Sequence, residues 1–148
     1  LELKGFSEEF RVNYATIFTE LILNAYEHGN LGISLEEKRE KIVEGAYDEF
    51  LEKRERKSKK KIYVTIKTVE QKDETIVITE IRDCGNGFDT KILENLMFRN
   101  RTEPSAVNGR GFLLSKALAE EINYSIDGNE VLFIQKEMTK KEDRDGTT

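Results

Sequence analysis

Two pairs of segments rich in β-branched residues limit most strongly what this chain can fold into. Residues 62–69 (IYVTIKTV) and 74–83 (ETIVITEIRD) flank the polar stretch QKDE, and residues 122–138 hold a second such pair around Asp127-Gly128. Two strand-like runs joined by a short polar or glycine-containing turn are typical of β-hairpins. We therefore predict two hairpins of antiparallel strands.

The first helix is predicted over residues 8–28. Ser7 is a suitable N-cap, acidic residues follow it, and Gly29-Asn30 can end the helix. Apolar side chains recur at helical spacing and would face the core: Phe10, Tyr14, Ile17, Phe18, Leu21, Ile22 and Ala25.

A second helix is predicted over residues 35–57, starting after Ser34 and interrupted by Gly45. Because few of its residues are apolar, we expect it to lie on the outside of the fold, as part of a helical insertion at 31–60. The basic run KRERKSKKK at 53–61 is typical of a solvated helix end, and binding to a nucleic acid or a membrane is the alternative interpretation.

The rest of the chain alternates between helices and loops. DTKILENLMF (89–98) can form a short helix, residues 99–108 are predicted to be a loop, and FLLSKALAEEI (112–122) predicts a third helix. The tail at 139–148 has no core-forming residue and is predicted to be disordered.

Hairpins grouped with helices favour an α+β fold. We predict a single domain over 1–138, a two-layer sandwich whose mixed, mainly antiparallel sheet carries helices on one face.

Composition narrows the class of protein. The 148 residues are 37% hydrophobic, which suffices for one core, and the net charge of -5 disfavours a general nucleic-acid binder. No apolar run reaches the roughly 20 residues that span a bilayer. Cys84 is the one cysteine, which favours the reducing cytoplasm, and we interpret it as a small buried thiol rather than a nucleophile. Because the chain starts at Leu1, we expect it to be part of a longer protein.

The first helix also carries polar side chains at intervals of four residues, namely Glu20, Asn24 and His28 in ELILNAYEHGN. A step of four advances only about 40° around an α-helix, so the three lie almost in line beside the apolar face. A carboxylate there can act as a general base, and an amide oxygen suits Mg²⁺. Zinc is disfavoured, because H-E-x-x-H is absent. The alternative is the polar border of an ordinary amphipathic helix.

The segment RDCGNGFD (82–89) follows a predicted strand. Gly85 and Gly87 allow a sharp turn and the close approach of a flat ligand, and Asp83 could accept a hydrogen bond from a ligand amine. A calcium loop is excluded, because glycines stand where side-chain oxygens are needed and Phe88 stands where glycine is required. A simple glycine turn is the alternative.

In NGRGFLLSKAL (108–118), a G-x-G sequence leads directly into the predicted third helix. Free backbone N–H groups and the positive end of the helix dipole can hold a phosphate there, and Arg110 adds charge. The segment is neither a Walker A loop nor a dinucleotide fingerprint. Three features together predict a site for Mg-ATP without a P-loop: a base with a magnesium ligand, an aspartate with glycines, and a glycine-led helix.

ELILNAYEHGN, DCGNGFD and GRGF resemble, in order, the N, G1 and G2 boxes of the GHKL ATPases, the superfamily with the Bergerat fold. The similarity covers residues 8–137, and the spacing and the closing GNEVLFIQK look most like the anti-sigma-factor serine/threonine kinase branch. The helical insertion is longer than the compact kinases have, and it resembles relatives fused behind bacterial receiver or phosphatase modules. Many members place a threonine in the last hairpin, where this chain has Gly128-Asn129-Glu130.

The resemblance implies a role for each matching residue. Glu20 would be the general base, Asn24 would hold Mg²⁺, and Asp83 would receive the adenine 6-amino group. Gly85 and Gly87 would shape the adenine pocket.

By the same resemblance, residues 89–108 would form a lid over ATP, and Arg99 or Arg101 could reach the phosphates. The phosphates themselves would be cradled by the backbone around Gly109, Arg110, Gly111 and Phe112.

In this branch the γ-phosphate passes to a serine or threonine of a small regulatory protein. The resemblance therefore implies a bacterial kinase of anti-sigma type, with an anti-anti-sigma-like or sigma-like protein as its partner and no nucleic acid or membrane. Two alternatives stay open: a non-catalytic module in which ATP switches a protein interface, and the catalytic domain of a histidine kinase. The second helix is a candidate docking surface, including for a second copy of the chain, because this branch is often dimeric.

Overall fold

The computed structural model describes residues 3–87 and 110–138. The predicted helix at 89–98, the loop at 99–108 and the tail at 139–148 lie outside these residues. The elements, in chain order, are the helices and strands α1 (Glu8–Asn24), the π-helix η1 (Ala25–Asn30), α2 (Leu35–Val43), α3 (Tyr47–Lys57), β1 (Tyr63–Glu70), β2 (Glu74–Arg82), α5 (Arg110–Leu118), β3 (Glu121–Tyr124) and β4 (Glu130–Met138).

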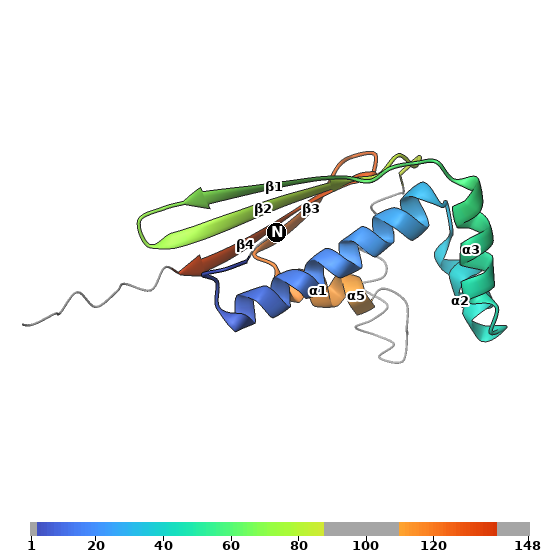
Figure 1. The fold of residues 1–148 in the computed structure, drawn as a ribbon, viewed down its shortest axis with the longest axis horizontal. Helices are drawn as coiled ribbons and strands as arrows, with labels where there is room; N and C mark the ends of the chain where they lie inside the picture. Colours follow the sequence, from blue (N-terminus) through green and yellow to red (C-terminus); the bar gives the residue numbers. More distant parts are fainter. Residues whose placement is uncertain (1–2, 88–109, 139–148) are drawn as a thin grey trace, which may run out of the picture.

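The four strands form one sheet in the order β1-β2-β4-β3, and every pairing among the described strands is antiparallel. The two predicted hairpins are β1–β2 and β3–β4, and β2 joins them by pairing with β4, with Ile78 opposite Ile134. Figure 1 shows α1 and α5 on one face of the sheet. The protein therefore has the predicted α+β fold.

The core lies between α1 and the sheet, as the helical periodicity predicted. Its buried members come from the apolar face of α1 and from alternate positions of β2 and β4: Phe10, Tyr14, Ile17, Leu21, Ala25, Val77, Ile81, Val131 and Phe133. The Tyr14 hydroxyl also forms a buried 2.7 Å hydrogen bond with Thr79 Oγ1. Because strand side chains alternate between faces, Asp83, just after β2, follows Thr79 and Ile81 onto the helix-covered face.

The first helix begins as predicted but ends differently. Ser7 is the N-cap, and its Oγ accepts a hydrogen bond from the N–H of Phe10 at 3.1 Å. After Asn24 the helix widens into η1, in which the N–H of Leu31 donates to the carbonyl of Tyr26 at 3.0 Å. A π-helical turn holds more residues than an α-helical turn, so the angular spacing predicted through residue 28 fails beyond Asn24.

The predicted second helix is in fact two helices, α2 and α3, packed against each other. Ser34 caps α2 in a capping box with Glu37. Gly45 separates the helices with φ of 69°, a left-handed conformation that ends helices and favours glycine. Figure 1 shows the pair beyond the C-terminal end of α1, away from the sheet. We call α2, α3 and their connection the helical hairpin.

The predicted third helix is shorter than expected. It ends at Leu118, and Glu121–Tyr124 forms strand β3, in which Ile122 pairs with Phe133 of β4. The residues ALAEEI favour a helix locally, but sheet pairing and packing of Ile122 against the core override that preference. In the described residues, no helix is long and apolar enough to cross a membrane.

Candidate functional site

Glu20 lies against the first turn of α5, because α1 and α5 pack together. A Cβ atom at Gly111 would stand 1.9 Å from Glu20 Oε2, so no residue larger than glycine fits there without a shift. A carboxylate is favoured near a helix N-terminus, where the helix dipole is positive. The first and third sequence motifs, far apart in the chain, therefore meet in space.

Asn24 follows Glu20 by one turn of α1 and is half-buried, so the two side chains share a side of the helix. His28 does not continue their line, contrary to the sequence prediction. Its Nδ1–H donates a short hydrogen bond to the carbonyl oxygen of Ile33, at the start of the helical insertion. The π-turn of η1 redirects this ring. His28 therefore has a structural role, and the candidate site keeps Glu20 and Asn24.

Asp83 is a buried carboxylate at the end of β2, with an exposed fraction of 7%. Its N–H donates to the carbonyl of Asn129 at 2.9 Å, and its Oδ1 accepts the N–H of Gly85 at 2.7 Å. Burial raises the pKa of its carboxyl group, and the Gly85 N–H and the charge of Lys60 offset part of this rise. Asp83 is thus held firmly by backbone groups in surroundings that favour a neutral partner able to donate hydrogen bonds.

Two glycines make room for Asp83. A Cβ atom at Gly29 would lie 2.3 Å from Asp83 Cγ, and one at Gly85 would lie 2.2 Å from the carbonyl oxygen of Gly29. Buried Asn30 adds a direct link, because its Oδ1 accepts the N–H of Cys84 at 2.8 Å. η1 and the RDCGNGFD segment therefore touch through their backbones, and Gly29 and Asn30 belong to the site although the sequence indicated only a helix stop there.

Gly87 has a different neighbour. Its φ is 75°, and a Cβ atom there would lie 1.6 Å from the carbonyl oxygen of Asp127, in the turn between β3 and β4. The sequence motif suggested that Gly85 and Gly87 leave space for a ligand. In the described structure, the places where their side chains would project are filled by backbone of Gly29 and Asp127, so both glycines are already required by the packing.

The third motif is described in part. Gly109 lies outside the described residues, and Arg110 begins α5. Phe112 is buried, with its ring centroid 6.0 Å from that of Tyr124. Burial raises the pKa of the Tyr124 hydroxyl, and the Asp83 carboxylate raises it further. Tyr124 therefore lies within electrostatic reach of Asp83, a relation that sequence spacing did not indicate. The predicted lid at 89–108, with Arg99 and Arg101, lies outside the described residues.

Cys84 was predicted to be buried, and this is wrong. Its side chain is exposed, and its Sγ donates to the carbonyl of Lys61 at 3.3 Å. The side chain of Asp83 is buried on the helix-covered side, which leaves the next residue facing outward.

The pKa of Asp83 leads to a prediction about stability. Because the folded chain holds this proton more tightly than the unfolded chain, the free energy of unfolding should fall as pH rises from the ordinary aspartate pKa of about 3.9 through the raised value. Asp83→Asn should remove this loss, as measured by chemical denaturation between about pH 4 and pH 7. The exposed Asp73→Asn is the control, and an unchanged pH dependence in Asp83→Asn would contradict the prediction.

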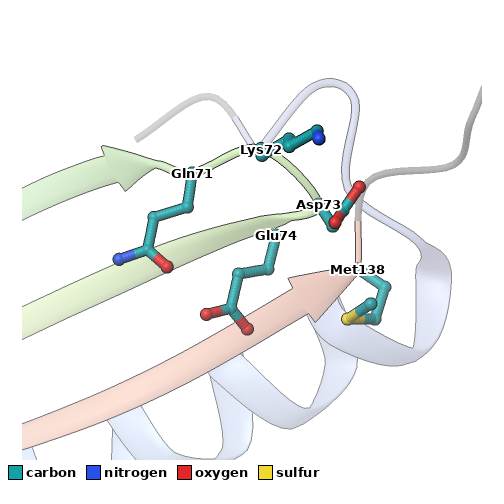
Figure 2. Close-up of a pocket in the computed structure, with 5 residues that line it drawn as sticks. All are labelled: Gln71, Lys72, Asp73, Glu74 and Met138. Carbon is teal, nitrogen blue, oxygen red and sulfur yellow. The ribbon is translucent and has the colours of Figure 1, made fainter.

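A separate hollow lies at the other end of the sheet, beside the β1–β2 turn. Figure 2 shows its lining residues, Gln71, Lys72, Asp73, Glu74 and Met138. Glu74 and Arg82 are the two ends of the nine-residue strand β2, and at about 3.3 Å per residue this hollow is more than 20 Å from Asp83. It is distinct from the place where the three motifs meet.

Fold and site together define a class of protein, an α+β domain that has no P-loop. Its site brings together Glu20 and Asn24 of α1, the buried Asp83, and the glycine-led helix α5. The sequence profile of the histidine kinase-like ATPase domain matches residues 1–135, and the chain belongs to this family. It is therefore an ATP-binding domain of the GHKL type. Searches of curated proteins and of solved structures gave no match.

The residues fit ATP, which domains of this family bind, generally with Mg²⁺. A carboxylate has about four acceptor positions, and the Gly85 N–H is the one hydrogen bond that the described residues give to Asp83. A neutral amine on a flat base suits the remaining positions in a buried setting. At the end of the site where the phosphates are expected, the amide of Asn24 offers a hard oxygen ligand of the kind that Mg²⁺ accepts.

Proposed function

We propose that this chain is the Mg-ATP-dependent catalytic domain of a regulatory protein kinase of the anti-sigma type, which phosphorylates serine or threonine of a partner protein. The observation that supports it best is the contact of Glu20 with Gly111. A domain that only bound ATP would not need a carboxylate at the helix end where the phosphates are expected. In a kinase, the same position brings a base close to the transferred group.

In this proposal, each chemical role belongs to one residue or segment of the chain. Glu20 accepts the proton of the attacking hydroxyl as that oxygen bonds to the γ-phosphorus and the bond to the ADP oxygen breaks. Asn24 holds Mg²⁺, which neutralises charge on the phosphates when bound. The first turn of α5 offers its N–H groups to the phosphates.

The adenine end is held by Asp83, which accepts the 6-amino group. Burial and the hydrogen bond that Oδ1 accepts from the Gly85 N–H keep the carboxylate in one orientation, so the adenine end of the site is largely formed before ATP arrives. The domain acts in the cytoplasm, where ATP is available, on a regulatory protein of anti-anti-sigma or sigma-like kind.

Calorimetric titration with ATP, with and without Mg²⁺, tests the nucleotide site. Asn24→Ala should weaken binding about tenfold when Mg²⁺ is present and change it little when Mg²⁺ is absent, because the side chain acts through the metal. Asp83→Asn should weaken binding under both conditions, because it acts through adenine.

The control is Asn13→Ala, which removes the same amide from α1 more than two turns earlier. If Asn24→Ala lowered the affinity equally with and without Mg²⁺, its role as the metal ligand would be wrong. If the unaltered chain bound no ATP under either condition, the proposed kinase activity would be wrong as well.

A further inference from the structure

The helical hairpin is attached to the rest of the domain at η1. Its two helices pack on each other, and Figure 1 shows them away from the sheet. An ion pair at 2.5 Å joins Lys38 Nζ of α2 to Glu27 Oε2 of η1. On α3, Arg54 donates to the carbonyl of Leu31 at 3.2 Å, just past η1.

The Glu27–Lys38 pair is shielded from water. Glu27 is 6% exposed, and the side chain of Lys38 is about one-third exposed. The Lys38 ammonium also lies 5.4 Å from the ring centroid of Tyr47. The Tyr47 hydroxyl is buried, and burial first, then the neighbouring Glu27 carboxylate, raises the pKa of Tyr47. A buried carboxylate needs its counter-charge, so removing Lys38 would force Glu27 and the turn that carries it to move.

The opposite side of the same π-turn supports the candidate site. Gly29 lies against the Asp83 carboxylate, and Asn30 Oδ1 accepts the N–H of Cys84. Only one residue separates Glu27 from Gly29, so one short turn contacts both the hairpin and the aspartate. Glu27 is thus connected to the Asp83 segment through Gly29, which lies against the Asp83 side chain, and Asn30, which is bonded to Cys84.

We propose that Glu27 and Lys38 are positioning residues, through which docking of the helical hairpin on η1 fixes Asp83 and so controls the adenine end of the site. A protein that binds the hairpin and separates this pair would thereby change the affinity for ATP. The statement about ATP rests on the proposed function, whereas the link between the hairpin and the Asp83 segment does not.

Amide hydrogen exchange tests the link without nucleotide. Lys38→Met should speed exchange of the Cys84 and Gly85 N–H groups about tenfold relative to Ile78, whose exchange in the central strand reports global unfolding. Lys38→Arg keeps the charge and should restore slow exchange. Lys53→Met is the matched control, because it removes a lysine from an ion pair of α3 in which both side chains are 71% exposed.

If Lys38→Met does not fold, the double variant Glu27→Gln/Lys38→Met, which leaves no unpaired buried charge, replaces it. Exchange at Cys84 and Gly85 that stays at the wild-type rate relative to Ile78 would overturn the proposal. So would equal acceleration in Lys53→Met.

The second readout is the ratio of the affinities for ATP and GTP, because GTP has a carbonyl oxygen where ATP has the amine. Lys38→Met should reduce this ratio about tenfold by weakening ATP binding alone. An unchanged ratio with faster exchange would restrict the link to structure and overturn control of the adenine end. If the wild-type chain bound no ATP, the proposed function would fail, and the exchange experiment would still decide the structural link.

Discussion

Replacing Glu20 with glutamine is expected to lower the rate of γ-phosphate release from Mg-ATP, in which water takes the place of the partner hydroxyl, at least about 100-fold, the contribution typical of a general base. Glutamine keeps the size of the side chain, so its packing against Gly111 survives, but it cannot accept a proton. Affinity for ATP should stay within about threefold or improve, because a negative charge beside the phosphates is removed. Phosphate release at saturating ATP and calorimetric titration measure the two effects separately.

Glu9→Gln is the matched control, since it makes the same chemical change at an exposed position of the first turn of α1. Equal rates in Glu20→Gln and the wild-type chain would show that Glu20 is not the base. Together with normal ATP binding, that result would favour the alternative of a non-catalytic switch.

The layers of this fold could be predicted because they depend on local periodicity. Phe10, Tyr14 and Ile17 recur at helical spacing and are all buried, and the two hairpins form around the turns that composition indicated. The sequence also singled out Glu20 and Asp83, and the structure places both where distant motifs come into contact; their chemical roles stay predictions.

The connections between motifs could not be predicted, because they are long-range. In the π-turn, Gly29 lies against Asp83, and Asn30 accepts the N–H of Cys84 in a bond that spans 54 residues. Glu27 gave no sequence signal, since a glutamate on a helix is usually exposed. The sequence predicted that a helix starts at residue 35, but it did not indicate that Lys38 of this helix pairs with Glu27.

Gly87→Ala is expected to have the largest effect of any glycine substitution among the described residues, because it combines two costs. The φ of 75° disfavours any side chain, and the new Cβ atom would stand 1.6 Å from the carbonyl oxygen of Asp127. Backbone cannot yield as a flexible side chain can, so the β3–β4 turn must shift. That turn includes Asn129, whose carbonyl accepts the N–H of Asp83.

We therefore expect Gly87→Ala to lower the free energy of unfolding by about 2–4 kcal/mol and the affinity for ATP at least about tenfold. Gly45→Ala separates the two costs: its φ is 69°, but nothing lies within 4 Å of the new Cβ atom. It should cost only the strain, about 1 kcal/mol, and leave ATP binding unchanged.

Equal destabilisation by both variants in urea denaturation would mean that the β3–β4 turn yields without cost, and that the glycines of RDCGNGFD are needed only for their backbone angles. A larger loss in Gly87→Ala, accompanied by weaker ATP binding, would instead show that this turn is part of the support of Asp83.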